Sequence, residues 1–223
     1  ETFNNIAEAW WDPNGKIAPL HVINPLRSNY VSEKVELKNK NVIDVACGGG
    51  LLVEALHNFG ANVTGIDISE VAINTAQIHA KKTNCDVTYI NGEAEELLPE
   101  KKEAFDVVTC LEAIEHVPDP QKLVQTCSDL CKPGGTIVFS TINRNPKSFL
   151  FAIIGAEYIL NLLPKGTHEF KKFIKPSELS NMMRNSDLEV KEIIGMSYNP
   201  LTKKYWLGKD VDVNYLIHAE KLK

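Results

Sequence analysis

The fold is decided by the stretch Asn41-Val42-Ile43-Asp44-Val45-Ala46-Cys47-Gly48-Gly49-Gly50. Its first half is a β-branched run, which is typical of a strand covered on both faces. The three glycines let the backbone turn sharply and approach a ligand, because no Cβ stands in the way. Apolar residues then recur at helical spacing as far as Gly60, where a left-handed cap would end a helix. Residues 41–60 are therefore predicted to form a strand, a glycine turn and a helix.

A second apolar run, Asn62 to Asp67, ends in a carboxylate 17 positions after Gly50. At the end of a second parallel strand, such a carboxylate accepts both ribose hydroxyls of a nucleoside that lies over the glycine turn. The alternative is an ordinary βαβ unit in which Asp67 only caps the next helix.

The glycine spacing restricts the kind of nucleoside. The dinucleotide fingerprint G-x-G-x-x-G needs a third glycine where this chain has Val53 or, in the other frame, Leu51. The spacing therefore opposes a nicotinamide dehydrogenase. The run from Asp44 to Gly50 instead resembles the D-x-G-x-G-x-G motif of S-adenosylmethionine-dependent methyltransferases, with Ala46 in place of the first glycine.

Composition is that of a globular protein with a sizeable core. The chain has 223 residues, of which 43% are apolar, and this size suits one large domain. Its formal net charge of −5 argues against a nucleic-acid binder, which usually presents a clustered basic face. The five cysteines are odd in number, so we expect free thiols in a reducing compartment rather than a disulfide framework.

Strands and helices are predicted to alternate along the chain. Further strands are expected at 86–91, 105–111 and 136–140. A helix that Ser69 can cap is expected at 70–82, and another from Pro120 onward. Five such βα units make an α/β fold with a doubly wound, mostly parallel sheet of the Rossmann-like type, whose ligands lie at the carboxyl ends of the strands. A helix near 176–185 and closing strands at 188–194 and 211–218, with antiparallel pairing, are expected to complete it.

The whole chain, 1–223, is predicted to be one domain with two additions. Residues 1–35, with Trp10 and Trp11, are expected to form a cap or lid over a cofactor. Residues 144–175 form an apolar insertion for substrate or membrane contact, since 148–163 carry a single charge and basic residues flank them. A membrane-crossing helix needs roughly 20 apolar residues, so a buried helix is the alternative.

Residues near the strand ends are candidates for cofactor binding. Gly48 lies in the turn itself, and Asp67 ends the second strand. Arg27 presents a guanidinium that can fork onto a ligand carboxylate, although exposed helix arginines are common. Glu93 follows the third strand, where it would meet an adenine edge or else begin a helix.

The chain resembles the ubiquinone-biosynthesis O-methyltransferase family from one end to the other. The resemblance rests on several runs beyond the glycine motif: Trp10-Trp11-Asp12, Asn24-Pro25-Leu26-Arg27, Glu112 to Asp119, Pro164-Lys165-Gly166-Thr167-His168, Tyr198-Asn199-Pro200 and Asp212-Val213-Asn214-Tyr215. It implies methyl transfer from S-adenosylmethionine to catechol-type hydroxyls of polyprenylated ubiquinone precursors, at an early and a late step. It also implies that Arg27, Ala46, Asp67 and Leu111 occupy cofactor-contact positions.

The same resemblance implies the partners and the location. The substrate would be a polyprenylated catechol or quinol, reached at an anionic membrane surface, with a place in a quinone-biosynthesis complex and no nucleic-acid partner. In a bacterium this is the cytoplasmic side of the inner membrane, and in a eukaryote it is the matrix side of the mitochondrial inner membrane. A carbon-methylating enzyme of the same pathway and a non-catalytic quinone- or lipid-binding accessory are the alternatives.

Methyl transfer to a phenol requires that its hydroxyl be ionised. A phenol ionises near pH ~10, so a general base or a divalent metal is needed. Glu112, Glu115 and His116 follow the fourth strand, and on a helical turn they would share one face. They are predicted to hold magnesium or zinc, or to act as catalytic residues with His116 as the base. The alternative is that they only shape the turn.

Overall fold

The computed structural model describes residues 10–15, 17–145, 148, 172–199, 201–202 and 204–223. Its strands, in chain order, are β1 (Asn41–Val45), β2 (Asn62–Asp67), β3 (Thr88–Asn91), β4 (Phe105–Leu111), β5 (Cys131–Ile142), β6 (Leu188–Asn199), β7 (Lys204–Gly208) and β8 (Asn214–Lys221). Its helices are α2 (Ala18–Lys34), α3 (Leu51–Asn58), α4 (Glu70–Thr83), α5 (Leu98–Lys101), α6 (Pro120–Leu130) and α8 (Pro176–Arg184), with 3-10 turns at Ala94–Leu97 and Ile114–His116.

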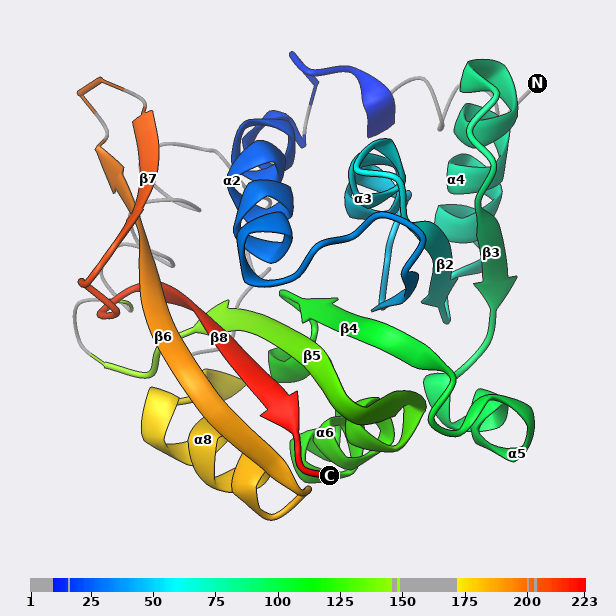
Figure 1. Cartoon of the computed structure of the whole chain (residues 1–223). Coiled ribbons are helices and arrows are strands. Elements are labelled where there is room, and N and C mark those ends of the chain that lie inside the picture. The colour runs from blue at the N-terminus through cyan, green and yellow to red at the C-terminus, as the bar shows by residue number, and fades with distance from the viewer. Residues whose placement is uncertain (1–9, 16, 146–147, 149–171, 200, 203) are drawn as a thin grey trace.

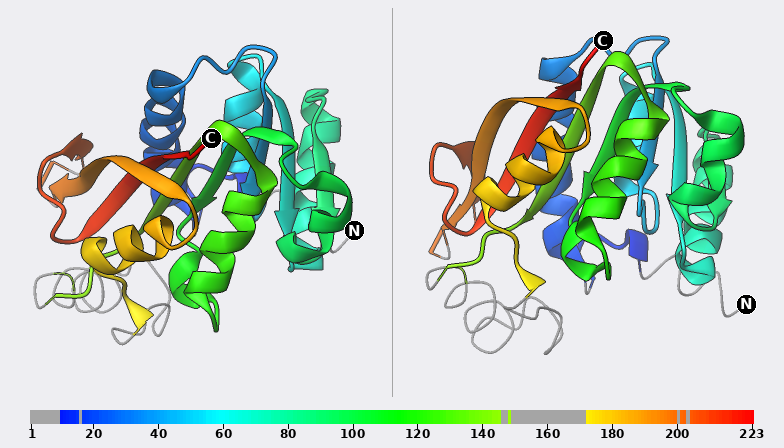
Figure 2. Two further views of the ribbon diagram at one scale, coloured as in Figure 1. Left: turned by 60° about the horizontal axis from the view of Figure 1, so that its bottom comes forward. Right: turned by 90° about the horizontal axis from the view of Figure 1, so that it is seen from below.

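The strands form one mixed sheet with the order β3-β2-β1-β4-β5-β8-β6-β7. The first five are parallel, and β8, β6 and β7 join them through antiparallel pairs. Helices α2, α3 and α4 cover one face of the sheet, whereas α6 and α8 cover the other (Figures 1 and 2). The predicted doubly wound sheet with an antiparallel closing strand is confirmed.

The two covered faces explain why the first strand reads as an unbroken apolar run. Val42 packs in the core beneath α2 and α3, whereas Ile43 and Val45 pack in the core beneath α6 and α8. Because both faces are covered, residues that point in opposite directions are all buried. The carboxyl end of this strand is therefore fixed from both sides, just where the glycine turn begins.

Some strand boundaries differ from the predicted ones, because pairing with a neighbouring strand overrides the local sequence pattern. Strand β5 begins at Cys131, ahead of the predicted turn, and its pairing with β4 shifts register between Phe105 and Val107. Strand β7 was not predicted at all, since it is a five-residue edge strand held only by its pairing with β6. The closing strand β8 begins at Asn214 rather than at residue 211.

One edge of the sheet gathers the residues that the sequence singled out. The carboxyl ends of β1, β2 and β4 meet there because these strands are parallel neighbours. Strand β5 ends at the same edge, and the antiparallel β8 begins there, with Asn214 paired to Ile142. The site is therefore built from segments far apart in the chain.

Candidate active site

The glycine turn after β1 has three residues in the left-handed region. Gly48 has φ +53°, Gly50 has φ +89°, and Ala46 has φ +59° although it carries a Cβ. A left-handed conformation costs a non-glycine residue roughly 1–2 kcal/mol. Ala46 is exposed, so its methyl group is not packed in the core. Ala46 thus keeps the backbone shape that suits the motif's first glycine.

Asp67 links the turn to the next helix. Its Oδ2 accepts a hydrogen bond from the Gly48 N–H (2.9 Å), and its Oδ1 accepts one from the Ser69 N–H (2.8 Å). The cap of α4 is instead Ser69, whose hydroxyl accepts from the Ala72 N–H at 3.3 Å. Each carboxylate oxygen of Asp67 has a second lone pair, which can accept a ribose hydroxyl. Asp67 both shapes the turn and can bind a ligand.

Ile68, which the sequence analysis missed, is the apolar residue next to this carboxylate. Its side chain is 76% exposed at the carboxyl edge of the sheet, and Val71 in the first turn of α4 is 45% exposed. Exposed apolar side chains beside a polar binding group are typical of a ligand site. The signal in the sequence was an isoleucine between Asp67 and the helix cap.

The other two predicted nucleoside contacts lie at neighbouring strand ends. Glu93 is exposed, and its N–H donates to the Glu96 carboxylate (3.3 Å), so it does begin a 3-10 turn. The Gly92 N–H donates to the Asp67 carbonyl at 3.1 Å, which keeps the end of β3 beside Asp67. Leu111 is half-buried at the end of β4. Contact of Glu93 and Leu111 with a cofactor stays a prediction.

Arg27 is buried rather than exposed, with 7% of its surface accessible. Its Nη2 contacts Glu112 Oε1 at 2.9 Å, a partner that sequence reasoning did not identify. The guanidinium has five N–H donors, so it can hold Glu112 and a ligand carboxylate together. Arg27 comes from α2, and the ion pair therefore connects that helix to the end of β4.

Glu112 is the most heavily bonded carboxylate of the site. Besides Arg27, it accepts hydrogen bonds from Ser140 Oγ at 2.7 Å and from Asn214 Nδ2 at 3.0 and 3.1 Å. Its backbone is left-handed, with φ +56°. Such a conformation is uncommon for a residue with a Cβ and marks a position held by its surroundings.

Glu115 lies buried beside Glu112, at 3% exposure. Its Oε2 accepts from Thr141 Oγ1 at 2.8 Å, whereas its Oε1 is buried without a hydrogen-bond partner in the described structure. Burial, and then the charge of Glu112, raises the pKa of Glu115 to about 8. Glu115 therefore takes up and releases its proton close to neutral pH.

The predicted helical turn across Glu112, Glu115 and His116 is wrong. Glu112 is left-handed, and only Ile114–His116 form a short 3-10 turn, in which His116 is exposed. In the described part of the chain, no group of three His, Cys, Asp or Glu side chains could hold a metal ion. The three residues as placed here therefore do not fit the predicted magnesium or zinc site.

Asp44 is a second buried carboxyl group, beneath the turn. It is 4% exposed, and Thr109 Oγ1 donates to its Oδ1 at 2.6 Å. Burial raises the pKa of Asp44 to about 7, although the Thr109 hydrogen bond and the Arg27 charge act to lower it. Asp44 thus titrates near neutral pH.

The N-terminal arm packs against the glycine turn. The Trp10 indole lies so close that a Cβ on Gly49 would fall 2.3 Å from its Nε1. Trp11 stacks on His79, with ring centroids 3.4 Å apart, and His79 Nδ1 is 2.8 Å from Glu54 Oε1. The arm is thus anchored to α3 and α4, and its opening as a lid stays a prediction.

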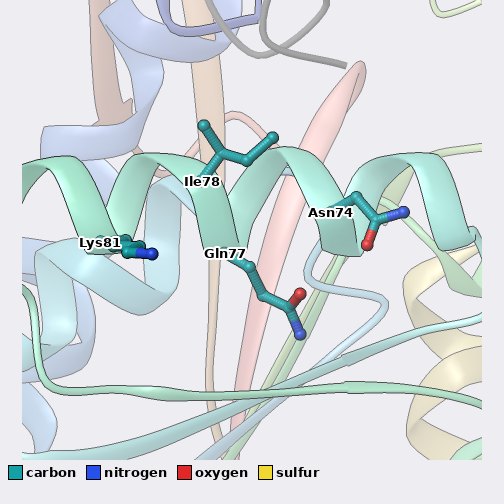
Figure 3. Close-up of a pocket in the computed structure, with 4 residues that line it drawn as sticks. All are labelled: Asn74, Gln77, Ile78 and Lys81. Atoms are coloured by element: carbon teal, nitrogen blue, oxygen red, sulfur yellow. The ribbon is translucent and has the colours of Figure 1, made fainter. Parts of the chain in front are cut away.

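Two features remain, the predicted insertion and a surface hollow. Most of the predicted insertion, including 149–163, falls outside the described residues, and no helix in the described part is long and apolar enough to cross a membrane. The described residues that line a surface hollow, Asn74, Gln77, Ile78 and Lys81, all belong to α4 (Figure 3). None of the predicted site residues lines that hollow.

Comparison with known proteins places the chain among methyltransferases. Residues 43–139 match the family described as "Methyltransferase domain". A relative from Marinobacter nauticus, named ubiquinone biosynthesis O-methyltransferase, is 57% identical over 97% of this chain and 92% of its own length. A relative of the same name from Nitrosospira multiformis is 55% identical over 97% of this chain and 91% of its own length.

Solved structures share the fold at low sequence identity. Magnesium protoporphyrin IX methyltransferase from Synechocystis, solved with bound S-adenosylhomocysteine, superposes with a TM-score of 0.71 at 17% identity, covering 99% of this chain and 94% of that one. A SAM-dependent methyltransferase from Aquifex aeolicus gives 0.67 at 14% identity, covering 99% and 97%. At such identities the likeness shows the fold alone.

The raised pKa of Asp44 predicts how stability depends on pH. The folded state binds this proton more tightly than the unfolded chain, whose aspartates have a pKa near 3.8. The stabilisation is therefore complete below pH ~4 and is lost as pH rises through about 7, with a slope of at most about 1.4 kcal/mol per pH unit. Asp44→Asn should remove this loss, so the variant gains stability relative to wild type between pH 5 and 8.

Urea unfolding of both proteins across that pH range measures the difference. Asp86→Asn is the matched control, because it removes one exposed aspartate. A stability difference between Asp44→Asn and wild type that stays constant with pH would contradict the assignment.

Proposed function

The chain belongs to the ubiquinone biosynthesis O-methyltransferase family, and from this premise we propose that it methylates a catechol-type hydroxyl of a polyprenylated ubiquinone precursor. The observation that carries the proposal is identity of 57% over 97% of the chain to a relative of that name. The site supports the proposal in two ways: the glycine turn is hydrogen-bonded to Asp67, and the carboxyl group of Glu115 exchanges its proton close to neutral pH. We propose that the protein catalyses methyl transfer at both an early and a late step of the pathway.

We propose that S-adenosylmethionine lies over the glycine turn. Asp67 would accept the ribose hydroxyls, and the exposed Ile68 would pack against the adenine face. Arg27 would hold the methionine carboxylate with the donors that Glu112 leaves free. Three further contacts are proposed at the same edge: the backbone at Ala46 and Gly48, the Glu93 side chain and Leu111.

The chemistry requires the chain to hold two reactants and to accept one proton. When bound, the cofactor supplies an electrophilic methyl group on a sulfonium, which an oxygen attacks in line. The Glu112–Glu115 pair would accept the phenol proton, as a new C–O bond forms and the C–S bond breaks to leave a neutral thioether. A carboxyl pKa of about 8 for Glu115 is close to the operating pH, where a general base is most effective.

A divalent metal is the other means of ionising the phenol. Oxygen ligands such as Glu112 and Glu115 suit magnesium, and Glu115 Oε1 has no hydrogen-bond partner in the described structure. Glu112, however, already bonds to Arg27, Ser140 and Asn214, and His116 is exposed rather than grouped with the pair. No step of the proposal depends on a metal ion.

A membrane contact is proposed from the sequence of the insertion. A polyprenylated substrate resides in the bilayer, and residues 148–163 are apolar, with basic residues on both sides. We propose that this stretch binds an anionic surface at the inner membrane, where other enzymes of the pathway are partners.

The first test of this function concerns cofactor binding. Asp67→Ala should weaken binding of S-adenosylhomocysteine about ten- to a hundredfold, because a charge-assisted hydrogen bond is worth ~1.5–3 kcal/mol. Isothermal titration calorimetry measures the affinity. Asp67→Asn keeps one acceptor oxygen, so its affinity should fall between that of wild type and that of Asp67→Ala. Unchanged affinity in a folded Asp67→Ala protein would rule out the placement.

The second test concerns the proton acceptor. Glu112→Gln and Glu115→Gln should each lower kcat by about 10²–10⁴-fold with S-adenosylhomocysteine affinity retained, because general-base catalysis contributes that much. His116→Ala should lower kcat less. Turnover is measured after exhaustive chelation and again with added magnesium or zinc. Activity that disappears on chelation and returns with metal would contradict a metal-free base, and near-normal rates in both glutamine variants would exclude the pair.

The third test concerns the membrane. Wild type should float with liposomes that contain anionic lipid and should float less with neutral liposomes, because the basic flanks add attraction. A Phe149→Glu, Phe151→Glu variant should lose flotation, since it places charges in the apolar stretch. Equal behaviour of variant and wild type on both liposomes would assign the stretch to the protein interior or the substrate pocket.

A further inference from the structure

Three polar atoms around Glu112 are buried and lack a hydrogen-bond partner in the described structure. They are Arg27 Nε, Glu115 Oε1 and Asn214 Oδ1. Arg27 and Asn214 both bond to Glu112, and the Glu112 charge acts on Glu115, so the three belong to one cluster. A buried polar group without a hydrogen-bond partner is destabilising, so such groups are normally satisfied. Three such atoms around one carboxylate indicate that a ligand supplies the missing partners.

The orientation of the Asn214 amide is fixed by its neighbours. Its Nδ2 donates to both oxygens of Glu112, at 3.0 and 3.1 Å. A flipped amide would place its oxygen against that carboxylate, where no hydrogen could lie between them. Asn214 therefore presents Oδ1 as an acceptor on the side away from the Glu112 carboxylate.

The backbone of Asn214 is equally constrained. It is the first residue of β8, and it is paired with Ile142 of β5 on one side and with Met196 of β6 on the other. A side chain on a strand with neighbours on both sides is positioned more exactly than one on a loop. Asn214 can therefore discriminate between ligands by a single hydrogen bond.

The chemistry of the cluster matches a ring with two adjacent hydroxyls. One hydroxyl must lose its proton to be methylated, which the Glu112–Glu115 pair would accept. An amide oxygen accepts a hydrogen bond but does not take the proton, so a hydroxyl beside it stays neutral. A carboxylate next to an amide oxygen can thus deprotonate one of two neighbouring hydroxyls while the other stays neutral and hydrogen-bonded.

We propose that Asn214 is a specificity-determining residue, whose Oδ1 accepts a hydrogen bond from the hydroxyl adjacent to the one that is methylated. The site would therefore select rings with adjacent hydroxyls over rings with one. This inference rests on the proposed methyl transfer to catechol-type hydroxyls. It adds the residue that binds the second hydroxyl. A buried acceptor left unpaired by the wrong substrate is an effective means of rejecting it.

The test compares two soluble substrates in the full-length protein. One is a dihydroxybenzoate with adjacent hydroxyls and a short alkenyl chain, and the other lacks the hydroxyl that is not methylated. Wild type should prefer the first by at least about a hundredfold in kcat/KM. Asn214→Leu keeps the side-chain volume without the acceptor, so it should reduce this preference at least about tenfold. The preference is a ratio, so a general loss of activity does not change it.

Ser140→Ala is the matched control. Ser140 also donates to Glu112, at 2.7 Å, but its hydroxyl is not among the unpaired buried atoms. Ser140→Ala should therefore lower kcat/KM for both substrates alike and keep the wild-type preference. If Asn214→Leu behaves in the same way as Ser140→Ala, Asn214 only positions Glu112 and the proposal is overturned.

The wild-type measurement keeps the proposal testable even if Asn214→Leu does not fold. Equal kcat/KM for the two substrates in wild type would overturn the role of Asn214 while leaving the methyltransferase function in place. Failure of wild type to methylate either substrate, with S-adenosylhomocysteine affinity intact, would instead overturn the proposed function itself.

Discussion

The ion pair between the buried Arg27 and the half-buried Glu112 is the interaction on which the site depends. It joins helix α2 to the end of β4, and Glu112 also holds Ser140 of β5 and Asn214 of β8. Removing Glu112 would leave the buried guanidinium of Arg27 without its anionic partner, which is destabilising because the charge is then uncompensated. The pair therefore fixes four elements from distant parts of the chain relative to one another, at the edge where cofactor and acceptor must meet.

Most of the fold could be predicted because its signals are local. The β-branched run of β1, the glycine turn and the Ser69 cap each act within a few residues, and the structure has all three. Strand β7 could not be predicted, because an edge strand exists only through its partner. The prediction that Glu112, Glu115 and His116 share one face was wrong for a related reason. Residues at i, i+3 and i+4 lie on one face only in a helix, and the backbone at Glu112 is left-handed.

The site itself was predicted as a set of residues but not as a set of contacts. Asp67, Glu112 and Glu115 do lie at the carboxyl edge, because the parallel strands β2 and β4 end there. Arg27 reaches the same edge from helix α2 through its contact with Glu112. Which group pairs with which depends on distances between remote segments, and no spacing rule gives the contact of Arg27 with Glu112. The sequence analysis named Asn214 only as part of the family resemblance and predicted no contact for it. Its unpaired oxygen can be recognised only once β8 is placed beside β5.

The same edge combines left-handed backbone with buried carboxyl groups of raised pKa. Ala46 and Glu112, at the ends of the neighbouring strands β1 and β4, are both left-handed without being glycine. Asp44 and Glu115 are buried, with burial as the main cause of their raised pKa values, and Arg27 is the cation that lowers both. One guanidinium thus serves three carboxyl groups, counting Glu112, so the cluster cannot be fully neutralised by ion pairing alone. Strained backbone and perturbed carboxyl groups lower stability, and their concentration where the strands end is expected when selection has acted on binding and proton transfer rather than on stability.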